Sequence, residues 1–309
     1  MRRSRRAAAL AVAACALLPY AAAGTAAPSC RGAAALDPAN GCGSPHRVKV
    51  TPHPDVAVLE HGPACIRTRA VQDPGASCWF PTASRGRKTT VALIGDSHAQ
   101  VWRAVVDPLA ASQRRRAVSL TLASCPFAHV DRINVSEERK ADCYAWGDRV
   151  NAWLQRYPAV RTVYFINSST YVFAPSGEQT GFDRGVAGYR AAFEALPPSV
   201  QHVVVIRDNP HMRYDTNACV ARAISRRRRP GPACALPRDE ALRPDPAAEA
   251  ASQLGGRAQV VDLTRFFCDE RLCYPALGGV LVYRDAQHLA RDYGRSLWRY
   301  LRASLPASA

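Results

Sequence analysis

The chain has 309 residues, of which 48% are hydrophobic, and this length suits one α/β domain with a sizeable core and a shorter extension. Its formal net charge of +16 would suit a nucleic-acid partner, but nearly all of the cations are arginine, a bias that together with the alanine content indicates codon composition. We therefore predict a solvated basic surface that attracts anionic polymers by charge alone, and no nucleic-acid binding.

The N-terminal segment is typical of an export signal. Four of residues 1–6 are arginine, and an apolar stretch that ends in small residues follows. We predict a signal peptide over residues 1–27, which would place the protein outside the cytoplasm, either secreted or associated with the envelope. Three alternatives stay open: Cys15 as a lipoprotein cysteine, Arg5-Arg6 as part of a twin-arginine signal, and an uncleaved signal anchor.

The cysteine content agrees with export. Of the 11 cysteines, Cys15 would leave with the signal, and the remaining ten are an even number that suits disulfides in an oxidising compartment. No Cys-x-x-Cys pattern occurs, so we predict no metal site and no cofactor.

Residues 28–88 are rich in proline, glycine and alanine and carry four cysteines, which predicts an N-terminal arm stapled by disulfides against a main domain of residues 89–309. In that domain, short apolar runs typical of buried strands alternate with helical patterns. The strands are predicted at residues 91–94, 118–123, 162–166, 202–206 and 258–263, and the helices at 100–109, 137–156, 184–196, 240–254 and 290–301. The alternation favours an α/β fold with a flavodoxin-like, doubly wound parallel sheet.

A Gly-Asp-Ser-His sequence at residues 95–98 stands where the first predicted strand meets a helix. At this place the carboxyl end of a strand opens into the ligand crevice of an α/β sheet, and the helix N-terminus offers unpaired N–H groups to an oxyanion. Ser97 could therefore be a nucleophile. The alternative is that Ser97 only caps the helix.

A possible base for this serine lies near the C-terminus, in Asp285-Ala-Gln-His288. The spacing lets the carboxylate accept from the imidazole Nδ1–H and leaves Nε2 free for a serine. An Asp-x-x-His by itself is more often a surface pair. Together with Ser97 it predicts a hydrolase triad in the order Ser, Asp, His.

These motifs resemble the SGNH (GDSL-like) hydrolases, and within them the extracytoplasmic domain of bacterial membrane acyltransferases that O-acylate cell-envelope glycans. The match extends from about Thr51 to Leu305. Its landmarks are Gly95 to Trp102, Leu122 to Pro126, Cys143 to Trp146, Val205 to Pro210, Cys268 to Cys273, and Val282 to Leu289. The resemblance implies Ser97 as nucleophile, His288 as base and Asp285 as the residue that orients it.

The oxyanion hole departs from the family pattern. SGNH enzymes usually supply a glycine after the second strand and an asparagine after the third, but here the second strand ends in Ala123-Ser-Cys-Pro126 without a glycine. Asn167 follows the third strand and is a candidate donor, although an asparagine at a strand end is often a turn former. Asp96, beside the nucleophile, is a further candidate for a substrate contact.

The landmarks also suggest that neighbouring cysteines pair in order along the chain. The expected pairs are Cys30 with Cys42, Cys65 with Cys78, Cys125 with Cys143, Cys219 with Cys234, and Cys268 with Cys273.

Two further side chains lie beside the motifs. His98 follows the nucleophile and could be an alternative base, but a residue at a helix start more commonly points away, and we favour that orientation. Asp208, in Arg207-Asp-Asn-Pro210, could contact substrate at the same sheet edge, but Asp-Asn-Pro more often forms a turn.

The resemblance implies an exported serine acyl-transfer enzyme of the O-acetyltransferase type, which would acylate envelope-glycan hydroxyls through an acyl-Ser97 intermediate. The alternatives are an envelope-glycan O-acetyl esterase and a catalytically silent envelope-binding module. A many-helix membrane domain precedes this module in the relatives, and none is found in the sequence. If the protein is a transferase, we expect the acyl group to come either from a separate membrane donor protein or from a soluble ester.

Overall fold

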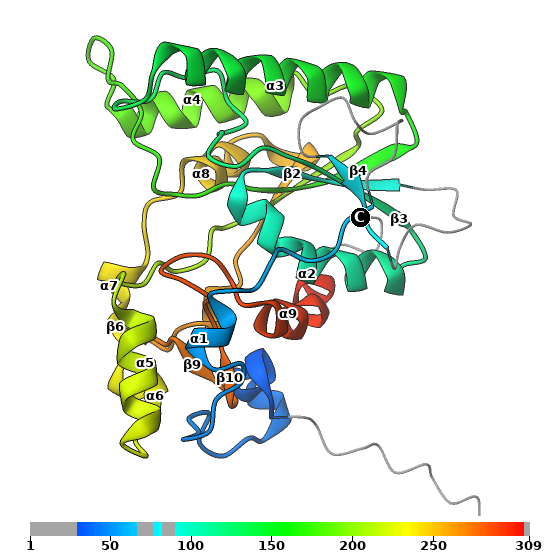
Figure 1. Ribbon diagram of the computed structural model, residues 1–309. Coiled ribbons are helices and arrows are strands. Elements are labelled where there is room, and N and C mark those ends of the chain that lie inside the picture. The colour runs from blue at the N-terminus through cyan, green and yellow to red at the C-terminus, as the bar shows by residue number, and fades with distance from the viewer. Residues whose placement is uncertain (1–29, 67–76, 82–89, 306–309) are drawn as a thin grey trace, which may run out of the picture.

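The computed structural model describes residues 30–66, 77–81 and 90–305 (Figure 1). The predicted signal peptide and Cys15 lie outside these residues, as does the predicted boundary between residues 88 and 89. None of the helices in the described part of the chain is long and apolar enough to cross a membrane.

A six-stranded sheet forms the centre of the fold. Its strands are β1 (Cys78–Trp79), β2 (Thr90–Gly95), β3 (Arg116–Thr121), β4 (Val160–Ile166), β5 (His202–Ile206) and β7 (Ala258–Val261). They lie in the order β1-β3-β2-β4-β5-β7, with β1 antiparallel to β3 and all other neighbours parallel. The five parallel strands follow the flavodoxin-like order, which confirms the predicted fold class.

Helices cover both faces of the sheet. One face carries α2 (Ser97–Ser112) and α9 (Arg291–Ala303), and the other carries α3 (Glu137–Arg156), α4 (Gly181–Glu194) and α8 (Pro246–Ser252) (Figure 1). Side chains alternate between the faces along each strand, so Val91 and Leu93 pack with α2 and α9 while Ala92 and Ile94 pack on the opposite side. Continuous apolar runs are therefore buried on both sides, as parallel sheets require.

One predicted helix is wrong. The structure divides the segment predicted as a single helix at residues 240–254 into α7 (Arg238–Ala241) and α8. Pro244 and Pro246 cause the break, because proline lacks the N–H of a helix interior and disfavours helical geometry in the preceding residue. Asp245 caps α8 by accepting from the N–H groups of Ala247 and Ala248, at 3.0 and 3.1 Å.

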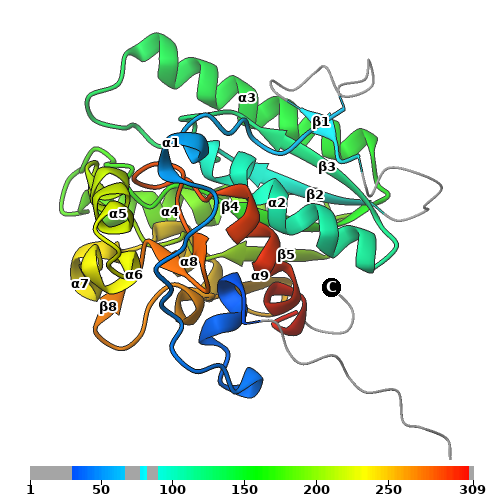
Figure 2. The same cartoon turned by 60° about the horizontal axis from the view of Figure 1, so that its bottom comes forward.

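The N-terminal segment packs against the main domain. Its short helices are η1 (Gly32–Leu36), η2 (Pro38–Asn40) and α1 (Pro54–Ala57), and Figure 2 shows η1 alongside α9. A small third cluster joins this segment to α5 (Thr216–Ser225), α6 (Pro230–Ala233) and the hairpin of β9 (Ala276–Leu277) and β10 (Val280–Leu281). Because β1 belongs to the central sheet, the segment is continuous with the main domain.

The remaining short elements are β6 (Leu236–Pro237), η4 (Gly255–Arg257), η5 (Thr264–Phe266) and β8 (Leu272–Cys273).

The five predicted disulfides are present. They join Cys30 to Cys42, Cys65 to Cys78, Cys125 to Cys143, Cys219 to Cys234, and Cys268 to Cys273. Each bridge closes a short loop, with a sequence separation between 5 and 18 residues. The bridges therefore fix connections around the sheet rather than distant parts of the chain.

Candidate active site

Ser97 is the first residue of α2, directly beyond the carboxyl end of β2. The turn between strand and helix depends on Gly95, whose φ of +147° is rare for residues with a side chain, and whose Cβ would lie 1.7 Å from the Ile166 carbonyl oxygen. Since β2 lies where the strand order reverses, between β3 and β4, the turn places Ser97 at the topological switch point of the sheet.

Asp96 fixes this turn. It is the N-cap of α2, and its Oδ1 accepts from the His98 N–H at 2.8 Å. Its Oδ2 accepts from the Ser168 N–H at 2.9 Å and from the Tyr171 hydroxyl at 2.6 Å. Because Asp96 is fully buried and both oxygens already accept protein donors, the structure gives it a structural position rather than one facing substrate.

Ser97, His288 and Asp285 form a hydrogen-bonded row. The Ser97 Oγ lies 2.9 Å from His288 Nε2, and His288 Nδ1 lies 2.8 Å from Asp285 Oδ2. The second carboxylate oxygen, Oδ1, accepts from the N–H groups of Gln287 and His288 at 2.9 and 2.8 Å. The three residues predicted as a triad are therefore brought together, with the imidazole held between a hydroxyl and a carboxylate.

The Asp285–His288 loop is held by the chain on both sides of it. Its base is closed by the bridge between Tyr283 and Leu289 and by the bond from the Arg284 N–H to the His288 carbonyl. From the segment after β5, the Met212 N–H donates to the Ala286 carbonyl at 2.7 Å. These backbone bonds fix the loop that carries His288 and therefore restrict where its ring can lie.

This row keeps some access to solvent. The Asp285 side chain is 40% exposed and the His288 side chain 15% exposed. Burial raises the pKa of Asp285, but the hydrogen bonds from His288 and Gln287 outweigh it and lower the pKa to about 2. Asp285 is therefore ionised at neutral pH and can orient and stabilise a protonated His288.

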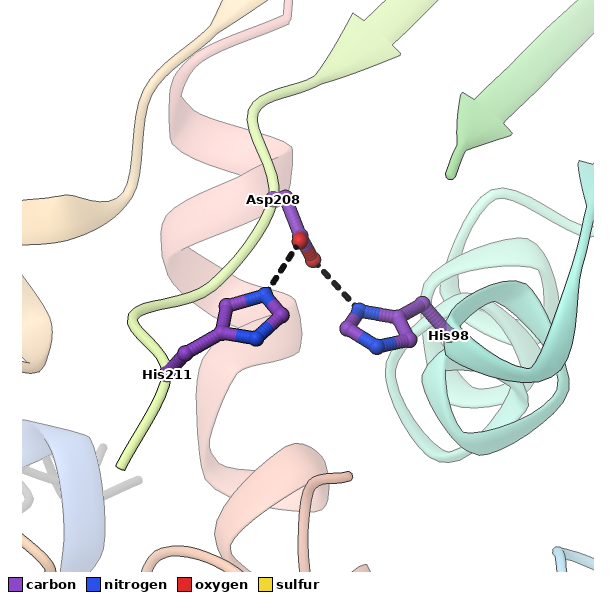
Figure 3. Close-up of side chains that lie close together, drawn as sticks. All are labelled: His98, Asp208 and His211. Carbon is purple, nitrogen blue, oxygen red and sulfur yellow. Dashed lines mark hydrogen bonds and ion pairs between the residues drawn. The ribbon is translucent and has the colours of Figure 1, made fainter. Parts of the chain in front are cut away.

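A second group of ionisable side chains lies beside the row but is buried. Figure 3 shows Asp208, which follows β5, between His98 of α2 and His211. Asp208 Oδ1 lies 2.5 Å from His98 Nδ1, and its Oδ2 lies 2.7 Å from His211 Nε2. The carboxylate also accepts from the N–H and hydroxyl of Ser169 at 2.8 and 2.9 Å and from the Asn209 N–H at 2.9 Å.

The charges of this buried group stabilise one another. Burial alone lowers the pKa of His98, but the Asp208 carboxylate raises it to about 9. In the same way, burial raises the pKa of Asp208, and the charges of His98 and His211 lower it well below its usual range. At neutral pH the group therefore contains an imidazolium and a carboxylate in a direct ion pair.

Asn167, the candidate oxyanion donor, is 3% exposed and bonds to the loop after β3. Its Oδ1 accepts from the Phe127 N–H at 3.2 Å, and its Nδ2 lies 3.5 Å from the Cys125 carbonyl oxygen. In that loop, where the family usually has glycine, Ser124 adopts a φ of +58°, in the region that glycine favours. Asn167 thus joins two loops that flank the end of β2, and its role as an oxyanion donor stays a prediction.

Sequence reasoning missed part of this arrangement. His98 bonds to Asp208, while His288 is the imidazole that contacts Ser97. Asp208 is neither a simple turn residue nor open to substrate, because both of its oxygens accept buried donors. The motifs in the sequence did not predict His211 as a member of this group. The signal that could have found it is the spacing Asp208-x-x-His211, which is the same as in Asp285-x-x-His288.

Comparisons with known proteins agree with the fold and the motifs. The family model described as SGNH domain (fused to AT3 domains) matches residues 64–300. Among solved structures, the lipopolysaccharide acetyltransferase periplasmic domain of Salmonella ser. Paratyphi A is similar in fold, with a TM-score of 0.54 and 12% identity, over 72% of this chain and 85% of that chain. A search of curated proteins found no match. Since the family model spans well over half of the chain, the protein belongs to the SGNH domain family.

Proposed function

We propose that the protein is an exported serine acyl-transfer enzyme that acylates hydroxyls of envelope glycans through an acyl-Ser97 intermediate. The observation that carries the proposal is the hydrogen-bonded row of Ser97, His288 and Asp285 at the start of α2. A serine with a neutral imidazole on its hydroxyl and a carboxylate behind that imidazole is the arrangement that activates a serine for acyl transfer.

The reaction would proceed in two balanced steps. Ser97 Oγ attacks the carbonyl of the acyl donor while His288 Nε2 takes the hydroxyl proton, and the tetrahedral intermediate collapses when His288 returns that proton to the leaving alcohol. In the second step an acceptor hydroxyl attacks the acyl-Ser97 ester. His288 takes the proton of the acceptor and gives it to Ser97 Oγ, which restores the free enzyme.

The start of α2 would stabilise the oxyanion of each intermediate. Backbone N–H groups in the first turn of a helix have no partner within the helix, and the helix dipole favours negative charge at this end. The His98 N–H is already used by Asp96, so the Ser97 N–H is the donor that we assign to the oxyanion. Asn167 is the candidate for a second donor.

Three observations support an envelope glycan as acceptor and acetyl as the acyl group. The similar solved structure is the periplasmic domain of a lipopolysaccharide acetyltransferase. Five disulfides suit an oxidising compartment outside the cytoplasm, in agreement with the predicted export. The formal net charge of +16 would increase encounter with anionic glycans at low salt.

The proposal is tested by the fate of the acyl group. The purified protein is given p-nitrophenyl acetate as a soluble donor, with increasing concentrations of chitopentaose as a hydroxylated acceptor, and mass spectrometry measures acetylated sugar against free acetate. We expect acetylated sugar to rise with acceptor concentration, and Ser97→Ala to form neither product above background. Acetate as the only product at every acceptor concentration would favour an esterase, and activity in Ser97→Ala would contradict the serine mechanism.

A further inference from the structure

His98, Asp208 and His211 form a buried group beside the residues of the acyl-transfer role proposed above, on which their own role rests. We propose that this group is a positioning device, which ties the helix carrying Ser97 to the loop carrying His288 and holds a positive charge against the His288 ring. In this role the group does not touch substrate. It acts on the reaction through His288.

The segment that follows β5 links the helix of Ser97 to the loop of His288 through hydrogen bonds. Asp208 binds His98, the residue next to the nucleophile, while its neighbour Asn209 donates to the Gln287 carbonyl at 2.9 Å. Asn209 also accepts from the indole N–H of Trp102, one turn further along α2, at 3.2 Å. A single segment thus bonds to the nucleophile helix at two points and to the loop of the base at another.

Ring contacts carry the electrostatic part. The His98 ring lies edge-on to the His288 ring, with centroids 5.2 Å apart, and stacks on the His211 ring at 5.3 Å. The His98 side chain is 1% exposed, so water screens its charge poorly. Among the described residues, His98 Nε2 is buried without a hydrogen-bond partner, and Asp208 is the carboxylate in direct contact with this imidazolium.

The groups that face His288 and His98 set the direction of the effect. The Asp285 carboxylate bonds to His288 Nδ1, the His98 ring lies edge-on to the His288 ring, and Arg284 Nε lies 3.6 Å from the Asp285 carboxylate. On His98, the carboxylates of Asp208, Asp96 and Asp285 all favour the charged form. The His98 imidazolium and the Asp285 carboxylate thus both lie against the His288 ring, so a change at His98 alters the electrostatic surroundings of the base.

The same three residues have the composition of a metal site, since one ligand atom from each lies within 4.8 Å of the others. The contacts favour the ion pair instead. Separations of 2.5 and 2.7 Å between ring nitrogens and carboxylate oxygens are hydrogen-bond lengths, and a metal at about 2.0–2.1 Å from each atom would force them apart. Ser169 and Asn209 also occupy the carboxylate with three further bonds.

The main test measures kcat/KM for p-nitrophenyl acetate against pH. We expect His98→Gln and Asp208→Asn to lower kcat/KM by roughly 10- to 100-fold, because the base loop loses its anchor. Both changes remove the positive charge at His98, the first directly and the second by taking away its partner. The low-pH side of the kcat/KM profile, here called the acid limb, should therefore move to higher pH by about 1 unit in each variant.

The matched control is His129→Gln, which breaks an exposed histidine–carboxylate pair on the surface, where His129 Nε2 lies 3.4 Å from Asp148. This variant should keep the rate and the acid limb of the wild type. A loss of rate in His98→Gln and Asp208→Asn with an unmoved acid limb would overturn the electrostatic part of the proposal. Bound zinc in the purified protein, with activity lost on chelation and restored by zinc, would overturn the ion-pair assignment.

A measurement on the wild type decides the question if the variants fail to fold. Nitrogen NMR of protein labelled at its histidine rings should show one imidazolium that stays protonated at pH 7.5, with a proton shared with a carboxylate. A neutral His98 at that pH would contradict the proposal. This measurement needs no turnover. A neutral His98 in an active enzyme would contradict the positioning role and leave acyl transfer intact. A charged His98 in an inactive enzyme would contradict the proposed function instead.

Discussion

Two Asp-x-x-His systems lie side by side at the carboxyl edge of the sheet, and they differ mainly in access to solvent. In the Ser97–His288–Asp285 row the carboxylate is 40% exposed, whereas the Asp208 side chain is 1% exposed. Ser97 and His98 are adjacent in the chain, yet the start of α2 directs them into different systems. The same residue types thus become reactive or structural according to burial and to whether a hydroxyl or a second imidazole completes the group.

The largest expected effect is on the exposed row. Ser97→Ala should lower the acyl-transfer rate by a factor of at least 10⁴, because the members of such a triad act as a unit. Its circular dichroism spectrum and urea midpoint should match the wild type, since the change removes one partly exposed hydroxyl. If Ser97→Ala lost its fold as well as its activity, Ser97 would have a structural role, and the assigned difference between a reactive row and a structural buried group would be wrong.

The next effect falls on the buried group. Asp208→Asn should lower the free energy of unfolding by about 3–5 kcal/mol, because it breaks a buried ion pair and leaves the His98 imidazole without its partner. Urea denaturation measures this loss. The reference change is Asp148→Asn at the exposed pair with His129, which should alter the free energy by no more than about 0.5 kcal/mol. Equal losses in the two variants would contradict the assigned difference in burial.

Stability should also depend on pH through His98. Its pKa rises from 6.5 in the unfolded chain to about 9 in the fold, so its stabilisation is fully present below pH 6.5 and is lost as pH rises through about 9. The free energy of unfolding should therefore fall by roughly 3 kcal/mol between these values. Urea midpoints measured over this range should decline in the wild type and stay flatter in His98→Gln. Parallel curves would contradict the charged state of His98.

The smallest expected effect concerns the loop after β3. Replacing Cys125 and Cys143 together by serine should cost about 2–4 kcal/mol, because the disulfide restricts the unfolded chain. Asn167 bonds to this loop, so the change should also lower the activity of the exposed row. The same replacement at Cys30 and Cys42 should cost similar stability with little loss of rate. Thermal unfolding and turnover of both variants, compared side by side, would test this.

Much of the fold could be predicted because local patterns and packing agree. The helix at Glu137–Arg156 and the strand at His202–Ile206 have the predicted bounds, since their apolar residues face one core without interruption. The helix expected at residues 240–254 failed because periodicity was given more weight than Pro244 and Pro246. Local sequence predicts a helix or strand reliably only where no residue, such as proline, disfavours the backbone geometry of that element.

The candidate site was predictable only in part. The exposed row follows motifs whose spacing already places a carboxylate beside an imidazole. The buried group does not, because His98 and Asp208 are 110 residues apart and meet only after the sheet has formed. The contact between His98 and Asp208 decides the charge of both residues against the effect of burial, and this contact exists only in the folded chain.

The central claim is that Ser97 carries the acyl group, and trapping the intermediate tests it most directly. The protein is mixed briefly with p-nitrophenyl acetate, quenched in acid and digested, and mass spectrometry locates the acetyl group. The account predicts one acetyl group on the peptide that contains Ser97, its disappearance when chitopentaose is added before the quench, and no acetylated peptide in Ser97→Ala. Acetylation of another residue at the rate of turnover, or unchanged turnover in Ser97→Ala, would contradict it.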